Sequence, residues 1–115
     1  MLRVAVLISG RGSNMQSLID ACREDGFPAE IVCVIANKPD AQGLQRAAEA
    51  GIPTAVISHR DFADRQTFDA ALDARIRESG AELVCLAGFM RILTAWFVER
   101  WHDRLINIPP SLPPS

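Results

Sequence analysis

Residues 4–21 read VAVLISGRGSNMQSLIDA and predict a buried strand, a glycine-rich turn and an amphipathic helix in direct succession. Residues 4–8 are a continuous apolar run, which is typical of a strand buried on both faces of a parallel sheet. Ser13 and Gln16 form a candidate capping box at the start of the helix. The apolar stripe of this helix follows the spacing i, i+3, i+4 and i+7 and consists of Met15, Leu18, Ile19 and Cys22.

The same order of strand and helix repeats along the rest of the chain. Further apolar runs predict strands at residues 31–36, 54–57, 83–87 and 105–108. Helical patterns lie between them, around residues 44–48, 68–76 and 95–101. We therefore predict an α/β fold in one domain, with a doubly wound, mostly parallel sheet and helices on both faces.

Polar side chains are expected to fix two of these helices. Asp61 is the candidate cap of the helix around residues 68–76, and Thr94 is the candidate cap of the helix at 95–101. Asp73 and Arg77 stand four residues apart, which predicts an ion pair on the outer face of their helix.

The composition argues against several classes of function. The chain has 115 residues and a formal net charge of −2, so it lacks the basic excess of a protein that binds nucleic acid or a membrane surface. Its three cysteines form no CxxC motif, which argues against a metal site and is typical of free thiols in a reducing cytosol. No apolar stretch reaches the 18 residues of a membrane span, and we expect a cytoplasmic protein.

Chemistry is expected at the carboxyl ends of the strands, where doubly wound sheets bind their ligands. The first strand is followed by SGRGSN at residues 9–14, whose glycines permit a tight turn before a helix. Backbone N–H groups at a helix start suit a phosphate, and an ordinary β–α turn is the alternative. The motif is not a full GxGxxG fingerprint, because Met15 stands at the third glycine position, and it is not a P-loop.

Two other strand ends carry polar residues that could react or bind. Residues 87–93 read AGFMRIL, and Arg91 could bind a carboxylate there or simply reach water. Asn107, near the end of the last strand, could donate to an oxyanion that forms at a carbonyl carbon, or form an ordinary Asx turn. The two histidines, His59 and His102, are expected to be solvated structural residues.

Four stretches occur together in the order of one protein family. They are residues 4–21, ANKPDAQGLQRAAEAGIPT at 36–54, ELVCLAGFMRIL at 82–93 and LINIPPSLPPS at 105–115. Together they resemble the amino-terminal part of glycinamide ribonucleotide formyltransferase, a folate-dependent family of purine biosynthesis. The resemblance implies that residues 1–115 are the Rossmann-type, nucleotide-binding part of one formyltransferase domain. It also implies transfer of a formyl group from 10-formyltetrahydrofolate to the amine of glycinamide ribonucleotide.

The resemblance further implies roles for individual residues. Gly12, Ser13 and Asn14 match the loop that holds the phosphate of the ribonucleotide. Asn107 matches the asparagine that stabilises the oxyanion and lies in the folate site. The other residues that match the folate site are Arg65, Met90, Arg91, Ile92 and Leu93. The co-substrate is thus 10-formyltetrahydrofolate, and no metal is implied.

The chain departs from the family pattern near residue 109. The family reads NIHPSLLP, whereas residues 107–114 read NIPPSLPP, so Pro109 stands at the position of a catalytic histidine and Pro113 replaces a leucine. Proline has no proton to transfer. Because the carboxy-terminal part of the family domain would lie beyond residue 115, we expect a truncated chain with impaired transfer. We also expect self-association through surface that the truncation exposes.

Two alternatives stay open on the sequence. The chain could be a non-catalytic remnant that binds a phosphate or nucleotide. It could also belong to a formyltransferase or deformylase that acts on another acceptor.

Overall fold

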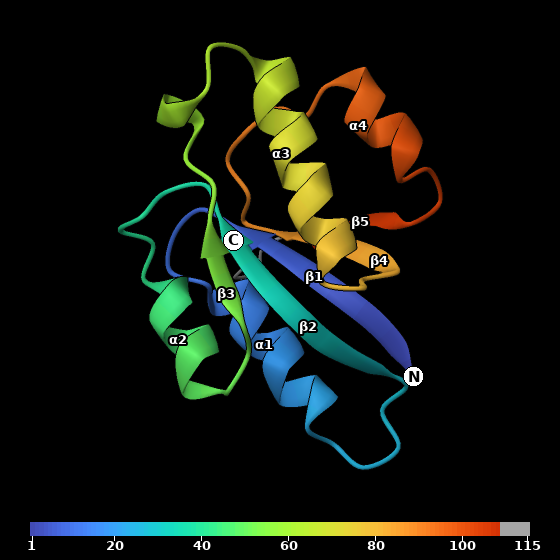
Figure 1. Ribbon diagram of the computed structural model, residues 1–115. Coiled ribbons are helices and arrows are strands. Elements are labelled where there is room, and N and C mark those ends of the chain that lie inside the picture. Colours follow the sequence, from blue (N-terminus) through green and yellow to red (C-terminus); the bar gives the residue numbers. More distant parts are fainter. Residues whose placement is uncertain (109–115) are drawn as a thin grey trace, which may run out of the picture.

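The computed structural model describes residues 1–108, which form a five-stranded parallel sheet in the order β3-β2-β1-β4-β5 (Figure 1). The strands are β1 (Leu2–Ile8), β2 (Ala29–Ala36), β3 (Thr54–Val56), β4 (Leu83–Ala87) and β5 (Leu105–Ile108). All the predicted strands are present. β1 and β2 begin earlier than predicted, because backbone pairing continues into exposed residues such as Arg3 and Glu30.

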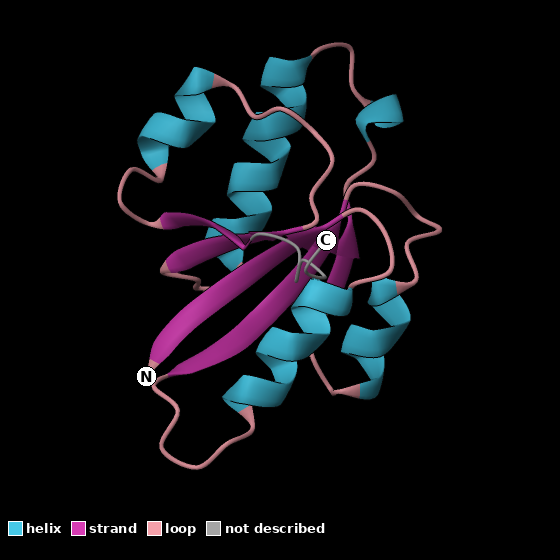
Figure 2. Ribbon diagram, turned by 180° about the vertical axis from the view of Figure 1, so that it is seen from behind, coloured by secondary structure: helices cyan, strands magenta, loops and turns pink. Residues whose placement is uncertain are grey.

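Helices cover both faces of the sheet, which confirms the doubly wound α/β prediction. α1 (Ser13–Cys22) and α2 (Gly43–Glu49) lie on one face, and α3 (Arg65–Glu78) and α4 (Ala95–Arg100) lie on the other (Figures 1 and 2). A short 3-10 helix, η1 (His59–Asp61), precedes α3. The strand order reverses between β1 and β4, so their carboxyl ends frame the crevice where such sheets bind ligands.

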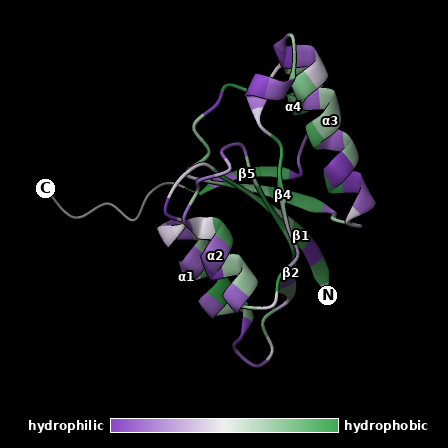
Figure 3. Cartoon of the chain, turned by 60° about the vertical axis from the view of Figure 1, so that its left-hand side comes forward, coloured by the Kyte–Doolittle hydropathy of each residue, from purple (hydrophilic) through white to green (hydrophobic). Residues whose placement is uncertain are grey.

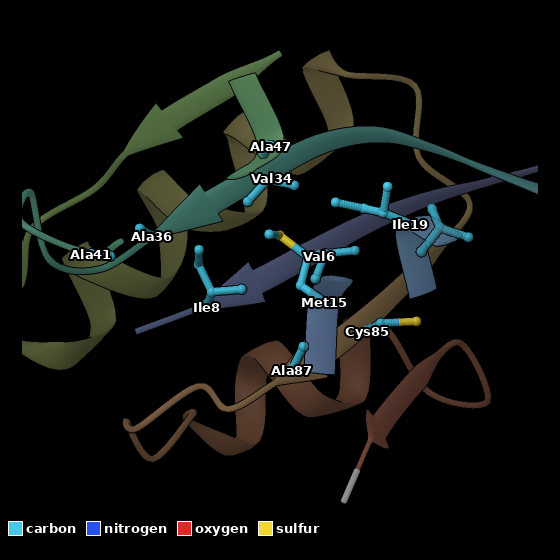
Figure 4. Packing of buried hydrophobic residues seen from close by; sticks show 11 residues of the cluster. Val6, Ile8, Met15, Ile19, Val34, Ala36, Ala41, Ala47, Cys85 and Ala87 are labelled. Atoms are coloured by element: carbon cyan, nitrogen blue, oxygen red, sulfur yellow. The ribbon is translucent and has the colours of Figure 1, made fainter. Parts of the chain in front are cut away.

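Alternate residues of β1 face the two helix layers. Val6 and Ile8 pack with Met15 of α1 on one side, as Figure 4 shows. Leu7 packs with Phe68 of α3 on the other side. The helices carry hydrophilic and hydrophobic segments, and the sheet lies between them (Figure 3). The continuous apolar run at residues 4–8 therefore reflects a strand with no face left to solvent.

The predicted capping box at the start of α1 is wrong. Gly12 is the N-cap, it adopts a left-handed conformation with φ 78°, and it offers no side-chain cap. Ser13 is already the first residue of the helix, and the Gln16 amide donates to Asp20 at 3.0 Å instead. The start of α1 is therefore formed by backbone rather than by a capping side chain.

The two caps predicted on the far face have different outcomes. Asp61 lies in η1 and caps nothing, because α3 begins four residues later with Asp64 as its N-cap. The Asp64 carboxylate accepts a hydrogen bond from the Thr67 backbone N–H at 2.8 Å. Thr94 is confirmed as the cap of α4, where its hydroxyl oxygen accepts from the Phe97 N–H at 3.3 Å.

A buried carboxylate, Asp73, ties α3 to α4. It accepts from the Trp101 indole N–H at 2.9 Å, from Arg77 Nε at 3.2 Å and from Arg100 Nε at 3.1 Å. The predicted pair of Asp73 and Arg77 exists, but its place on an outer face is wrong, because Asp73 is only 5% exposed. The guanidinium of Arg77 also lies over the Trp101 ring at 4.7 Å. The hydrogen bond from the buried Trp101, which follows α4, thus holds the Asp73 carboxylate on the buried side of α3.

We expect the free energy of unfolding to fall at acid pH through Asp73. Burial alone raises the pKa of Asp73, but hydrogen bonds from Arg100, Trp101 and Arg77 outweigh it and hold that pKa below its ordinary value. A lowered folded-state pKa stabilises the fold fully above the unfolded value of about 3.9. This stability is lost as the pH falls through the folded value. Urea unfolding at pH 7 and pH 3 should show a smaller pH effect in Asp73→Asn than in the parent. Equal pH effects would contradict this assignment.

Within residues 1–108, β3 and β5 form the edges of the sheet. Ile106 of β5 is 47% exposed, and the expected self-association stays a prediction. No helix in this described part is both long and apolar enough to cross a membrane. The same residues contain no group of three or more His, Cys, Asp or Glu that could hold a metal ion.

Candidate functional site

A cavity of about 320 Å³ lies at the carboxyl ends of β1 and β4, where the strand order reverses. We call it the first cavity. It is lined by residues 9–14, Lys38, Ala87, Gly88 and Met90. The structure therefore brings the three residues of the predicted phosphate loop, Gly12 to Asn14, together with Met90 of the predicted folate segment.

Close backbone packing shapes the loop between β1 and α1. A Cβ atom on Gly12 would lie 2.8 Å from the Gly43 Cα and 3.0 Å from the Met15 Cε. Gly43, at the start of α2, also donates its N–H to the Gly10 carbonyl at 2.9 Å. Gly12 thus packs directly against the start of α2, and α2 contacts the loop.

The first cavity has a positive lining. Arg11 and Lys38 both line it and are exposed, and no carboxylate is among its lining residues within 1–108. The N-terminus of α1, which carries a partial positive charge, opens at the same place. Since charge, dipole and backbone all favour an anion here, the cavity suits a phosphate better than a neutral ligand.

A buried hydrogen-bond chain connects the ends of three strands beside this cavity. The Ser9 hydroxyl donates to the Asn37 Oδ1 at 2.7 Å, and the Ser9 oxygen accepts from the Met90 N–H at 2.7 Å. Ser9 is 5% and Asn37 is 2% exposed. Neither Ser9 nor Asn37 was predicted as a site residue, although each is the first polar residue after an apolar strand. That position was the signal that could have identified them.

We expect Ser9→Ala to lower the free energy of unfolding by about 1–3 kcal/mol, because it leaves buried groups of Asn37 and Met90 unpaired. Urea unfolding measures the loss, and amide hydrogen exchange at Met90 should become faster. Ser17→Ala is the matched control, since Ser17 is exposed and its hydroxyl contacts only the Ser13 carbonyl at 3.4 Å. A loss of unfolding free energy no larger than in this control would show that the hydrogen-bond chain does not stabilise the fold.

The segment between β4 and α4 is held at both ends while its apolar side chains stay exposed. Met90 is held by Ser9, and the Thr94 N–H and hydroxyl donate to the buried Asp69 carboxylate at 2.7 and 2.8 Å. Met90 and Ile92 are 77% and 69% exposed, whereas Leu93 packs against the core. A backbone fixed in this way presents apolar surface next to the first cavity.

Arg91 neither reaches freely into water nor pairs with a carboxylate within the described residues. Its guanidinium lies over the Phe68 ring at 4.7 Å, and its Nε is buried without a hydrogen-bond partner there. The stack on Phe68 fixes the direction of the side chain, and the unpaired Nε is a donor that a polar ligand could use.

Of the predicted site residues, residues 91–93, Arg65 and Asn107 do not line the first cavity. Arg65 is the first residue of α3 and is exposed. Asn107 is exposed on β5, where it stands opposite Leu86 of β4. Asn107 is thus separated from β1 by one strand, at the same carboxyl edge of the sheet. Pro109 and Pro113 lie outside the described residues.

The histidine prediction is only half right. His102 is exposed and lies 3.4 Å from the Asp103 carboxylate. His59 is half-buried in η1, and its Nδ1 is buried with no hydrogen-bond partner within residues 1–108. It is therefore only partly solvated.

Comparisons with known proteins agree with this arrangement. The sequence matches the formyl transferase family over residues 2–115. It is 58% identical over 115 residues to the trifunctional purine biosynthetic protein adenosine-3 of Drosophila melanogaster, covering 98% of this chain and 8% of that protein. It is 46% identical over 115 residues to the phosphoribosylglycinamide formyltransferase of Haemophilus influenzae, covering 100% of this chain and 54% of that protein.

The fold of this chain is also similar to that of a solved structure. The crystal structure of phosphoribosylglycinamide formyltransferase from Brucella melitensis superposes with a TM-score of 0.92 at 44% identity. The match covers 98% of this chain and 59% of that chain. The chain thus spans a little more than half the length of these bacterial relatives.

Proposed function

Because this chain belongs to the formyl transferase family, we propose that it takes part in formyl transfer from 10-formyltetrahydrofolate to the amine of glycinamide ribonucleotide. The relatives that carry the name phosphoribosylglycinamide formyltransferase support this acceptor. Their match over nearly the whole chain also supports the resemblance that the motifs suggested. The reaction is a step of purine biosynthesis.

One observation supports the acceptor most strongly, namely the positive first cavity around Gly12, Ser13 and Asn14. The cavity volume, about 320 Å³, is at the lower end of the range for small-molecule sites. Arg11 and Lys38 supply two cations, and the described residues of the lining include no opposing carboxylate. In this proposal the ribonucleotide phosphate binds there, and the amine extends toward β4 and β5.

The folate would lie along the segment after β4. Exposed Met90 and Ile92 offer apolar surface for a ring system, and Arg91 offers an unpaired donor. Leu93 packs against the core beneath this surface. In this proposal Arg65, at the start of α3, binds the charged end of the co-substrate. The residues present thus fit a molecule with a flat apolar head and a negative tail.

Asn107 is the proposed catalytic residue of this chain. When the amine attacks the formyl carbon, negative charge develops on the formyl oxygen, and the Asn107 amide would donate a hydrogen bond to it. Such a donor contributes about 10²–10³-fold in rate. Its exposed position on β5 leaves the amide accessible to a ligand.

Binding without transfer is the second candidate function, and Pro109 is the observation that favours it. The residue stands where the resemblance places a catalytic histidine, and a positioned acid–base group typically contributes about 10²–10⁴-fold. Mass spectrometry of the ribonucleotide after incubation with 10-formyltetrahydrofolate separates the two. A formylated product supports transfer, and intact ribonucleotide that still binds supports the binding role. If a formylated product formed only with a different amine, that result would favour another acceptor.

Isothermal titration calorimetry tests the proposed acceptor. Glycinamide ribonucleotide should bind at least about 100-fold more tightly than glycinamide riboside, which lacks the phosphate, because charge-assisted hydrogen bonds contribute about 1.5–3 kcal/mol each. Added salt should weaken binding of the ribonucleotide and leave binding of the riboside unchanged. Equal affinities for the two compounds would show that the first cavity is not a phosphate site.

A further inference from the structure

A second cavity of about 420 Å³ lies beside the first, at the carboxyl ends of β2 and β3. It is lined by residues 37–40, which follow β2, and by residues 58–60, which follow β3. Lys38 lines both cavities. The proposed formyl transfer leaves the second cavity without a role.

The charge around this cavity favours an anion. Lys38 and Arg60 are exposed, and neither lies within 4.0 Å of a carboxylate in the described part of the chain. Among residues 1–108, Asp40 is the only acidic residue of the lining. The lining therefore has two unpaired cations and one carboxylate, which leaves an excess of positive charge. Such a site attracts a ligand with two negative charges more strongly than a ligand with one.

The neutral polar groups of the lining suit the same ligand. Within the described part of the chain, the Ser58 hydroxyl oxygen accepts a long bond, at 3.4 Å, from the Arg60 N–H and donates to no group, so its own proton is available there. His59 lies between these residues in η1 and also lines the cavity. Its Nδ1 is the buried atom without a partner noted above, and an unpaired buried polar group is costly unless a ligand or water satisfies it.

We propose that the second cavity is a second anion site, which binds a phosphate dianion, either free or carried by a sugar-sized molecule. Lys38 and Arg60 would supply the charge, and Ser58 and His59 would supply hydrogen bonds. The volume exceeds what one phosphate needs, which leaves room for an attached sugar. The site shares Lys38 with the first cavity, but residues 58–60 line the second cavity and not the first, and the proposal does not depend on the acceptor proposed for the phosphate loop.

The two histidines of the chain allow a direct test by NMR at constant pH. Inorganic phosphate is titrated into the protein while the ring signals of His59 and His102 are followed. His59 should shift with saturation, and the exposed His102 should not, which makes it an internal control for ionic strength. A second titration with ribose 5-phosphate distinguishes the sources, since tighter saturation would show contacts to the sugar. Identical shifts of both rings would overturn the proposal.

Matched variants assign the response to the cavity. Arg60→Gln should weaken phosphate binding at His59 by about tenfold, and Asp40→Asn should strengthen it, because the one opposing charge is removed. Gly12→Ala should alter the response of the Ser13 amide and leave the response of His59 intact. If Arg60→Gln and Asp40→Asn both leave the His59 titration unchanged, the second site does not exist. The response at Ser13 reports on the first cavity alone, so either proposal can fail without the other.

Discussion

Replacing Gly12 by alanine is expected to weaken binding of glycinamide ribonucleotide by about 100-fold or more. Gly12 has φ 78°, a conformation that costs a residue with a Cβ roughly 1–2 kcal/mol. The new Cβ would also lie 2.8 Å from the Gly43 Cα, which is backbone and cannot rotate away. The loop must therefore shift, and two misplaced charge-assisted hydrogen bonds to the phosphate account for a loss of this size.

Gly51→Ala is the matched control for this variant. Gly51 has φ 77°, almost the same conformation, but nothing lies within 4 Å of a Cβ at that position. It should lose stability through strain alone and keep its affinity for the ribonucleotide. Calorimetric titration gives the affinities, and urea unfolding verifies that both variants are folded. Parent-like affinity in Gly12→Ala would contradict the role of the loop.

Replacing Asp73 by alanine is expected to lower the free energy of unfolding by about 3 kcal/mol. The substitution leaves the buried Trp101 indole N–H without its acceptor and leaves Arg77 and Arg100 without their shared carboxylate. Breaking a buried ion pair by removing one partner typically costs about 3–5 kcal/mol, and the lower end applies because both arginines are partly exposed. This is a large fraction of the roughly 5–15 kcal/mol that stabilises a domain.

Glu78→Ala provides the comparison on the same helix. Glu78 is exposed near the end of α3 and makes no side-chain hydrogen bond or ion pair within residues 1–108. Its removal should change the free energy of unfolding by less than about 0.5 kcal/mol. Urea unfolding at pH 7 measures both variants. A loss for Asp73→Ala no larger than that for Glu78→Ala would show that α3 and α4 are held together by apolar packing alone.

The sheet was predictable because its three central strands, β1, β2 and β4, are each built on a continuous apolar run. Residues 31–36 and 83–87 have no alternation, and the structure buries them between two helix layers. Helix ends were less predictable. Asp61 and Asp64 are both residue types that can cap a helix, and which of them caps α3 depends on where the preceding turn ends. The 3-10 helix η1 includes Asp61, so α3 begins only after it, at a distance that residue types alone do not determine.

The candidate site was predictable in part. The candidate phosphate loop was recognisable because a strand, two glycines and a helix stripe follow one another within residues 4–21. The chain from Met90 through Ser9 to Asn37 was not, since its members are 81 and 28 residues apart. The burial of Asp73 also depends on Trp101, which is 28 residues away along the chain. Contacts of this kind depend on how the elements pack, and local patterns do not carry that information.

A crystal structure of the protein with glycinamide ribonucleotide tests the central claim most directly. The account predicts the phosphate in the first cavity, with its oxygens about 3 Å from backbone nitrogens at the start of α1 and close to Arg11 and Lys38. It also predicts that the amine points toward Asn107. A phosphate bound away from residues 12–14, or an amine that points away from β5, would contradict the account.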